Sequence, residues 1–421
     1  MLDIKFIREH TDLVREGIRK KGDVDRVDEI LSADARRREL LQKVEVLKNR
    51  RNVVSEDVGK LKRAGQDAAS VIAEMDKVKN EIKAIDDELR QVEEGLHRLL
   101  LLVPNVPHPS VPVGATPADN VPIATWGEEP IIDFAPRAHW ELFDKLGIVD
   151  FERGVKITGA GFPVYKGQGA KLQRALINFF LDEAGLRGYE EVQPPLMVNA
   201  ASATGTGQLP DKEDLMYVVP KDELFLVPTA EVPVTNIHRD ELLNEQQLPV
   251  KYCAYTPCFR REAGSYGKDV RGLNRLHQFD KVELVKYVHP EKSYDELEGL
   301  REDAERLLRK LGLRYRVLLM CTGDMGFTQS KKYDLEVWSI GQKRWLEVSS
   351  ISNFEAFQAR RTNIRFRPAA GGKPEFVHTL NGSGLALPRV VAALVEHYQT
   401  PEGKIVVPKA LHEYTGFELI G

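Results

Sequence analysis

Residues 256–283, TPCFRREAGSYGKDVRGLNRLHQFDKVE, join two polar strands through a glycine-rich, basic segment. The first strand is predicted over residues 252–262. Side chains alternate between the two faces of a strand, so Arg260 and Glu262 point to one side and Arg261 to the other. A cation and an anion therefore face the same way.

The second predicted strand, residues 277–287, carries polar side chains on one face. Alternation places four residues there: His277, Phe279, Lys281 and Glu283. At ~3.3 Å per residue, the Cα atoms of Phe279 and Glu283 lie about 13 Å apart along the strand. This face is too polar for a plain core, and the distance suits an extended small ligand.

The segment between the strands combines glycines with positive charge. Glycines that tolerate positive φ are Gly264, Gly267 and Gly272, and the cations are Lys268, Arg271 and Arg275. A loop of this kind can close over a polyanion. For FRRE alone, a hairpin with a solvated basic tip is an equal alternative, but the HQFDKVE that follows argues against it.

The composition is that of a globular chain large enough for more than one domain. Of the 421 residues, 42% are apolar and 29% are charged, which is the balance of a soluble protein. The formal net charge of -4 excludes a generally basic nucleic-acid binder, so any RNA contact requires local basic patches.

Neither targeting nor metal-binding signals stand out in the sequence. The first residues, MLDIKFIREHTDL, are too charged for a signal peptide and too acidic for a transit peptide. The longest aliphatic run, LLLLV at 99–103, is too short to span a bilayer, so we expect a cytoplasmic protein without membrane association. Three cysteines without CxxC spacing indicate no zinc site.

Residues 1–103 are predicted to form a helical domain, with short helices before Gly22 and a long coiled coil over about 27–100. Asp3 and Thr11 are candidate N-caps of the short helices. Apolar residues follow heptad spacing in two separate runs. The first is Leu40, Val44, Leu47, Val54, Val58 and Leu61, and the second is Val71, Met75, Val78, Ile82, Ile85, Leu89, Val92, Leu96 and Leu99. The turn-like RAGQDAAS between the runs predicts an antiparallel arm of two long helices.

FRREAGSYG and HQFDKVE resemble motif 2 of class II aminoacyl-tRNA synthetases, in the form found in the seryl-tRNA synthetase family. The resemblance covers essentially the whole chain. It implies an α+β fold, the class II synthetase catalytic fold, with a mainly antiparallel sheet flanked by helices. The hairpin-like links between strands from 192 to 382 favour such a sheet independently.

The arm has two interpretations. A dimerisation stalk is the general expectation for a coiled coil, and the basic clusters at 36–38, 50–51 and 60–63 are then solvated faces balanced by acids. In the seryl-tRNA synthetase family, however, such an arm grips the long variable arm of the tRNA. The resemblance therefore favours tRNA binding.

Prolines recur from 104 to 130, which excludes regular helix and predicts a semi-rigid linker over 104–130. The catalytic domain is then expected over 131–421. A helix over 170–184 followed by the strand YEEVQPP resembles motif 1, the dimer interface of the class, so the resemblance implies a homodimer. The glycine-rich TGTGQLP at 204–210 is predicted as a loop.

The resemblance also implies the residues of the site. Residues expected to bind L-serine are Thr229, Ala230, Glu231, Arg260, Glu283 and Ser383. Residues expected to bind ATP are Arg260, Arg261, Glu262, Phe279, Glu347, Val348, Ser349, Ser350 and Arg389. Arg260, Glu262 and Arg389 are the expected catalytic residues, and Glu347 and Ser350 are expected to support Mg²⁺ with ATP.

Some of these assignments have structural alternatives. Thr229 is as well suited to capping the helix that follows. In WLEVSS, strict alternation puts Glu347 and Ser350 on opposite faces, so a β-bulge is needed to bring them together. Without the resemblance, Arg389 would be a surface or ion-pair arginine near a helix start, preceded by Pro388 and a predicted turn at 382–384.

The implied function is ATP-dependent activation of L-serine to seryl-adenylate and transfer of serine to tRNA(Ser), and to tRNA(Sec) where that tRNA is present. Two other classes remain, namely a ligase that loads serine on a carrier protein and a non-catalytic synthetase paralogue. The long arm argues against the first, which needs no grip on tRNA. Arg260 and Arg389, both present, argue against the second.

Deletion of about residues 30–100 is expected to leave serine activation largely intact and to cripple tRNA charging. The reason is that every chemical motif follows residue 200, whereas the heptads and basic clusters precede residue 104. Pyrophosphate exchange and tRNA aminoacylation, measured on the same preparation, separate the two steps. Normal charging by the truncated protein would contradict the assignment of the arm.

Overall fold

The computed structural model describes residues 1–210, 213–262 and 271–421. It divides into two compact units, one formed by residues 2–19 and 23–104 and the other mainly by residues 105–421. Within the described ranges, no helix is long and apolar enough to cross a membrane. The loop predicted around Gly264, Gly267 and Lys268 lies outside the described residues.

The N-terminal unit is helical: α1 (Ile4–Glu9), α2 (Thr11–Lys20), α3 (Val27–Arg63) and α4 (Ala69–Leu101). Asp3 caps α1, because its side chain accepts from the backbone N–H groups of Lys5 and Phe6. Thr11 does not act as an N-cap, since its hydroxyl donates to the Ile7 carbonyl at 2.9 Å.

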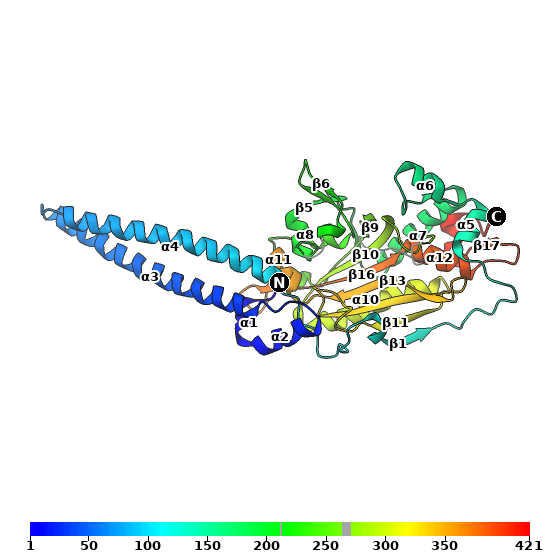
Figure 1. The fold of residues 1–421 in the computed structure, drawn as a ribbon, viewed down its shortest axis with the longest axis horizontal. Helices are drawn as coiled ribbons and strands as arrows, with labels where there is room; N and C mark the ends of the chain where they lie inside the picture. Colours follow the sequence, from blue (N-terminus) through cyan, green and yellow to red (C-terminus); the bar gives the residue numbers. More distant parts are fainter. Residues whose placement is uncertain (211–212, 263–270) are drawn as a thin grey trace. The chain divides into compact units, whose positions relative to one another are not determined.

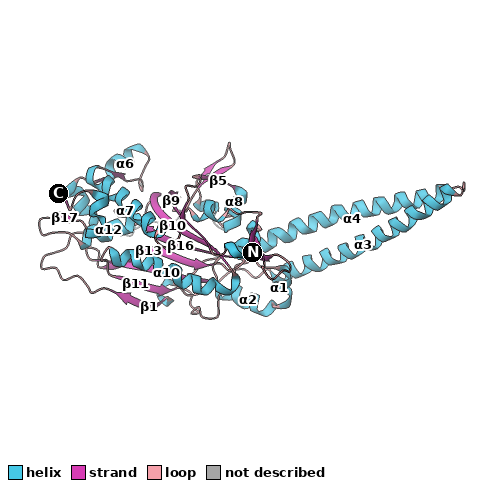
Figure 2. Cartoon of the chain, turned by 180° about the vertical axis from the view of Figure 1, so that it is seen from behind, coloured by secondary structure: helices cyan, strands magenta, loops and turns pink. Residues whose placement is uncertain are grey.

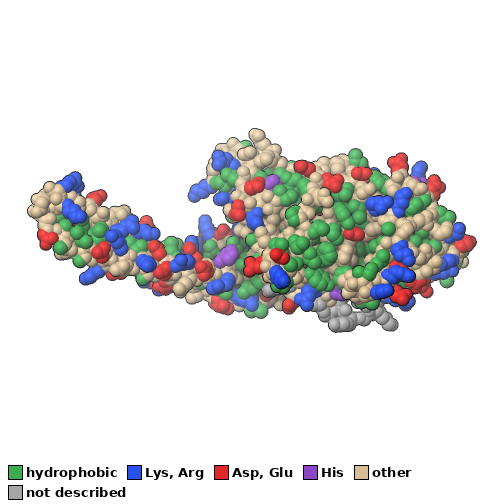
Figure 3. All heavy atoms as spheres, turned by 90° about the horizontal axis from the view of Figure 1, so that it is seen from above, with side chains coloured by type: hydrophobic (Ala, Val, Ile, Leu, Met, Phe, Trp, Pro, Cys, Tyr) green, Lys and Arg blue, Asp and Glu red, His purple; other side chains and the backbone are tan. Residues whose placement is uncertain are grey.

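Helices α3 and α4 pack along their lengths as the long hairpin of Figure 1, which confirms the predicted arm. Buried seam residues include Leu40, Val44, Val54 and Val58 on α3 and Val78, Ile82 and Leu96 on α4. Ion pairs Arg36–Glu88, Arg37–Glu93 and Arg50–Glu74 link the two helices in antiparallel register. Cationic and acidic side chains are interspersed along the arm in Figure 3, so part of its positive charge is locally balanced.

The second unit is built on an eight-stranded sheet of order β1-β11-β12-β13-β16-β10-β9-β4 (Figure 2). Its strands are β1 (Val121–Trp126), β4 (Glu190–Glu191), β9 (Val250–Phe259), β10 (Gln278–Val288), β11 (Tyr315–Leu319), β12 (Lys331–Ser339), β13 (Arg344–Asn353) and β16 (His378–Ala386). All neighbours are antiparallel except β4 and β9. The mainly antiparallel sheet is as predicted.

Smaller elements surround this sheet. The helices are α5 (His139–Leu146), α6 (Phe151–Ile157), α7 (Gly167–Gly185), α8 (Ala200–Thr206), α9 (Glu231–Thr235), α10 (Ser293–Lys310), α11 (Phe357–Thr362), α12 (Leu387–His397) and α13 (His412–Thr415). The short strands are β2 (Val149–Asp150), β3 (Val164–Tyr165), β5 (Met197–Asn199), β6 (Val218–Val219), β7 (Leu224–Leu226), β8 (Leu242–Asn244), β14 (Arg365–Arg367), β15 (Glu375–Phe376), β17 (Ile405–Val406) and β18 (Leu419–Ile420).

The hydrophobic core lies between the sheet and helices α7, α10 and α12. Helix α10 contributes an apolar stripe, of which Leu297, Leu300 and Leu308 are fully buried. Val282 and Leu284 bring one face of β10 into this core. The other face of β10, with Phe279, Lys281 and Glu283, is left for the site.

Two local predictions were wrong. Part of TGTGQLP belongs to α8, which Asn199 caps by accepting from the Ser202 N–H and which ends at Gly207 with φ +83°. The turn predicted at 382–384 lies inside β16. A Cβ on Gly382 would sit 3.1 Å from the Leu300 side chain, so this glycine serves close packing rather than a turn.

The proline-rich segment also contains a strand, which was not predicted. Strand β1 pairs with β11 at the edge of the sheet, although it contains Pro122. The register shifts between Pro122 and Ala124, and an edge strand with such an irregularity tolerates a residue that lacks the N–H donor.

Leu300→Ala is expected to lower the free energy of unfolding by about 2–5 kcal/mol, because it leaves a cavity between α10 and β16. Urea unfolding of the second unit, followed by tryptophan fluorescence, measures this. Leu186→Ala is the matched control, since Leu186 is 71% exposed and its loss should change stability by less than ~0.5 kcal/mol. Equal effects of the two substitutions would contradict the described core.

Candidate active site

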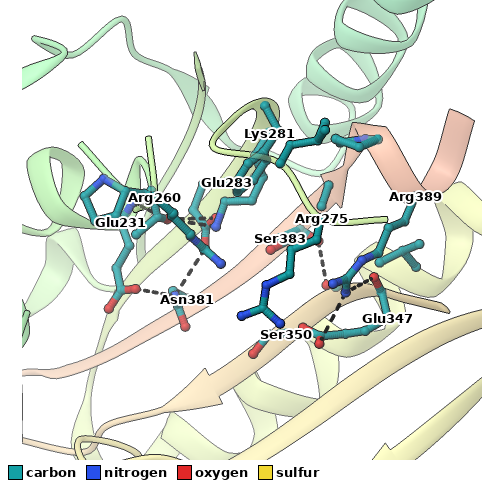
Figure 4. Close-up of a pocket in the computed structure, with 18 of the residues that line it drawn as sticks. Glu231, Arg260, Arg275, Lys281, Glu283, Glu347, Ser350, Asn381, Ser383 and Arg389 are labelled. Carbon is teal, nitrogen blue, oxygen red and sulfur yellow. Dashed lines mark hydrogen bonds and ion pairs between the residues drawn. The ribbon is translucent and has the colours of Figure 1, made fainter. Parts of the chain in front are cut away.

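A cavity of about 500 Å³ opens on the polar face of β10, between β9, β13, β16 and the start of α12 (Figure 4). This volume is typical of small-molecule sites. Charged residues around it are Glu231, Arg260, Glu262, Arg275, Lys281, Glu283, Lys332, Glu347 and Arg389. Of the residues expected to bind serine or ATP, all described by the structure, Ala230 and Arg261 are not among the lining residues.

Two carboxylates, Glu231 and Glu283, lie buried at one end of the cavity. The amide nitrogen of Asn381 donates to both, at 2.9 Å to Glu231 and 3.1 Å to Glu283 (Figure 4). Lys281, two residues before Glu283 on the same face of β10, forms an ion pair with it and donates to the Thr229 hydroxyl at 2.8 Å. Both side chains of this ion pair are buried, and the Lys281 ammonium neutralises the Glu283 carboxylate, which explains how a buried carboxylate is tolerated.

Glu231 begins α9, and its position depends on a second layer of polar contacts. Gln358 of α11 donates to Glu231 at 2.7 Å. The Glu231 N–H donates to the Thr229 hydroxyl at 3.2 Å, so Thr229 contacts both the start of the helix and the site. Among the described residues, the buried side-chain carbonyl oxygen of Asn381 has no hydrogen-bond partner.

Arg260 and Glu262 both line the cavity, although β9 ends at Phe259. The Arg260 N–H donates to the His277 carbonyl at 2.9 Å, and its guanidinium lies 5.1 Å from the centre of the Phe279 ring. Glu262 adopts a positive φ of 48° and forms an ion pair with Arg275. Strand alternation predicted that Arg260 and Glu262 face the same side. They do both face the cavity, but they lie in irregular backbone after the end of β9.

A β-bulge in β13 brings Glu347 and Ser350 to the same side. Glu347 pairs with Glu336 and Ser349 with Leu335, so Val348 is the extra residue. Glu347 and Ser350 both line the cavity, and the buried Ser349 donates to the Ser383 carbonyl at 2.7 Å. The bulge removes the conflict that strict alternation created.

Arg389 lies in the first turn of α12, where Pro388 fits without disturbing the helix. Its guanidinium donates to the backbone carbonyls of Glu347 at 2.9 Å and Asn274 at 3.1 Å, and it lies 3.5 Å from the Glu347 carboxylate. Partial burial opposes ionisation of Glu347, but Lys332 and Arg389 outweigh it and lower the pKa of that carboxyl.

Asp334 stands behind this part of the site, on β12. Burial raises its pKa to about 7, although the Lys332 ammonium is 3.3 Å away. The pKa of Asp334 is thus raised, whereas that of Glu347, which faces the cavity, is lowered. Among the described residues, no group of three or more His, Cys, Asp or Glu side chains is arranged to hold a metal ion.

Sequence reasoning missed several residues of the cavity. Lys281 and Arg275 were recognised only as charges on the strand face and in the loop, and Asn381 and Lys332 were not singled out. Gln358, which supports Glu231 from outside the cavity, was not singled out either. The position of Lys281 between Phe279 and Glu283 on one strand face was an available signal. The contacts of Asn381 and Gln358 depend on pairing between distant segments, for which the sequence offers no local signal.

Known families match both units of the chain. The model of the seryl-tRNA synthetase N-terminal domain matches residues 1–107, and that of the class II tRNA synthetase core domain (G, H, P, S and T) matches residues 217–398. A curated serine–tRNA ligase of Salinibacter ruber is 57% identical over 100% of this chain and 99% of its own length. The chain belongs to the seryl-tRNA synthetase family.

Solved structures of the family agree. The seryl-tRNA synthetase of Pyrococcus horikoshii complexed with ATP has a TM-score of 0.94 and 38% identity, covering 100% of this chain and 99% of that one. The cytoplasmic serine–tRNA ligase of Naegleria fowleri, in complex with AMP, has a TM-score of 0.89 and 26% identity, covering 100% and 98%. The predicted family and class II synthetase fold are confirmed.

Proposed function

We propose that this protein is an ATP-dependent serine–tRNA ligase, which forms seryl-adenylate and transfers serine to tRNA(Ser), and to tRNA(Sec) where that tRNA is present. The observation that carries the proposal is one cavity with a buried carboxylate pair at one end and Arg260 and Arg389 beside it. The curated relatives named serine–tRNA ligase support it.

Serine would bind at the carboxylate end. Glu231 and Thr229 suit an ammonium group, because a carboxylate and a hydroxyl can both accept from it. Glu283, with Ser383 directly opposite on β16, suits the serine hydroxyl.

ATP would occupy the end lined by Phe279, Glu262, Glu347 and Arg389. Phe279 offers a ring for stacking adenine and Glu262 an acceptor for its amino group, while Arg389 holds the nucleotide from the other side. Arg260 would contact both the serine carboxylate and the α-phosphate, whose negative charge must be shared when they react. No covalent protein nucleophile is needed, so positioning and electrostatics are the main catalytic effects.

Glu347 and Ser350 fit a Mg²⁺ ion that accompanies ATP. Both supply oxygen ligands on the cavity side of the β13 bulge, and the carboxyl of Glu347 has a lowered pKa. When bound, the ion would neutralise phosphate charge. The chain's own contribution is to keep Glu347 ionised and directed at the cavity, with Lys332 behind it.

The remaining parts of the proposal follow the family. The N-terminal arm would bind tRNA through basic residues such as Lys62 and Arg63 on its exposed faces. A homodimer would form through the motif 1 region, which comprises α7 and β4. We place the enzyme in the cytoplasm, where its tRNA and ATP are found.

Pyrophosphate exchange with each of the twenty amino acids, followed by charging of tRNA, tests the function. Serine-dependent exchange and seryl-tRNA formation are expected. Exchange without tRNA charging would favour a ligase acting on a carrier protein, and no exchange with any amino acid would favour a non-catalytic paralogue.

Arg260→Ala is expected to reduce adenylate formation at least ~100-fold with little change in fold, because a donor directed at developing negative charge contributes roughly 2.7 kcal/mol or more. Steady-state pyrophosphate exchange measures the loss. Arg367→Ala, which removes an exposed arginine of β14, is the control and should leave the rate unchanged. Near-normal exchange in Arg260→Ala would refute the role.

Glu283→Gln is expected to lower the preference for serine over alanine and to raise the KM for serine. Sites built to hydrogen-bond a substrate hydroxyl can reject its absence by about 10⁴-fold, and the substitution weakens that bond and unpairs the buried Lys281. The KM for ATP should change little. Exchange with serine and with alanine measures the ratio.

Asp280→Asn is the matched control for this experiment, since it makes the same kind of change on the opposite face of β10, where Asp280 accepts from Gln173 and Tyr255. It should leave the serine-to-alanine ratio intact. An unchanged ratio in Glu283→Gln would assign the hydroxyl to another group, such as Glu231 or Ser383.

A further inference from the structure

His139 and Glu396 form a fully buried polar pair outside the cavity. His139 is the first residue of α5, and Glu396 lies near the end of α12. One carboxylate oxygen of Glu396 accepts from the backbone N–H of His139 at 2.9 Å and contacts its Nδ1 at 2.8 Å. The other accepts from the Ser339 hydroxyl and from the Gly341 N–H at 3.1 Å. The carboxylate is therefore well satisfied without water.

The second ring nitrogen of His139 contacts the chain that returns to β10. Its Nε2 accepts from the backbone N–H of Leu273 at 2.9 Å. Since Nε2 must be unprotonated to accept, the proton lies on Nδ1 and is donated to Glu396. Gly272 has φ +67°, and a Cβ there would lie 2.1 Å from Nε2, so the imidazole fills the space against this glycine.

Gln342 connects the His139–Glu396 pair to Asn274, the residue after Leu273. Gln342 donates to Glu396 at 3.2 Å, and its carbonyl oxygen accepts from the Asn274 side chain at 2.9 Å. The Asn274 backbone carbonyl in turn accepts from Arg389 at 3.1 Å. The chain at Leu273 and Asn274 is thus fixed on one side by the buried network and on the other by an arginine of the cavity.

Arg389 and Glu396 belong to the same helix, seven residues or about 10 Å apart along its axis. Helix α12 therefore holds the Leu273–Asn274 backbone at two points, directly through Arg389 and indirectly through Glu396 and His139. The next residue, Arg275, lines the cavity and pairs with Glu262. A shift of this backbone would reach the nucleotide end at two groups, Arg389 through the Asn274 carbonyl and Glu262 through Arg275. The serine end is held by other elements.

We propose that His139 and Glu396 are positioning residues for the nucleotide end of the cavity, acting through the Leu273 N–H and the Asn274 backbone on Arg389 and Arg275. The inference rests on the proposed function only for the identity of the nucleotide. Its consequence is selective: loss of the His139–Leu273 contact weakens ATP binding and leaves serine binding unchanged.

Two substitutions of His139 separate its two bonds. An asparagine amide reaches about as far as Nδ1, so His139→Asn keeps the donor to Glu396 and loses the acceptor for Leu273. A glutamine carbonyl reaches about as far as Nε2, so His139→Gln keeps the acceptor and loses the donor. We expect the KM for ATP in serine-dependent pyrophosphate exchange to rise about tenfold in His139→Asn, which corresponds to about 1.4 kcal/mol. We expect it to change less than about threefold in His139→Gln, with the KM for serine within about twofold in both variants.

Thermal unfolding of each variant tests the alternative that His139 only stabilises the core. If so, both substrates' KM values would rise together and follow the loss in melting temperature, and this outcome would overturn the proposal. A parental KM for ATP in folded His139→Asn would overturn it as well. Should His139→Asn not fold, Gln342→Ala removes the acceptor for Asn274 at a half-buried position, and the same ATP-selective increase is expected.

Titration calorimetry with ATP gives the same comparison without turnover. A parent protein that binds ATP but shows no serine-dependent exchange would refute the proposed function alone, and the rise in the Kd for ATP in His139→Asn would still decide the role of the pair. An unchanged Kd would overturn the positioning role while leaving the function intact.

Discussion

The burial of two carboxylates, Glu231 and Glu283, is the constraint on which the site depends. Each would cost several kcal/mol if it were desolvated without partners. Asn381 donates to both, and Lys281 neutralises Glu283. These groups come from α9, β10 and β16, so they meet only when the antiparallel register of the sheet is correct.

That register is fixed from the opposite side of the sheet. Glu283 pairs with Ser383 and Leu284 with Gly382, and a slip of one residue would turn the carboxylate into the core. Leu284 and Val282 pack against α7, α10 and α12, whereas Gly382 leaves room for Leu300. Strand β10 therefore packs in the core through one face and lines the cavity with the other. The packing of the core face fixes the positions of the cavity side chains.

Local periodicity explains what could be predicted. Heptad spacing located the two arm helices, and alternation put Phe279, Lys281 and Glu283 on one face, because these patterns depend only on neighbouring residues. The bulge at Val348 and the strand placement of Gly382 were not predictable, since both depend on partners far away in the sequence. The resemblance to a known family supplied the residue roles, which periodicity could not.

Of the described arginines that line the cavity, Arg260 and Arg389 are held by backbone carbonyls. Arg260 donates through Nε to the Pro228 carbonyl at 3.2 Å, and Arg389 donates to the carbonyls of Asn274 and Glu347. Carbonyl acceptors orient a guanidinium without cancelling its charge. The Glu347 carboxylate, 3.5 Å from Arg389, partly neutralises that arginine. Cations placed in this way need little reorganisation when phosphate charge develops, which is the condition for effective electrostatic catalysis. The position of each arginine is then only as well defined as the backbone carbonyl that holds it. Asn274 lies in an irregular segment, so the contacts of that segment with His139 and Gln342 support the position of Arg389.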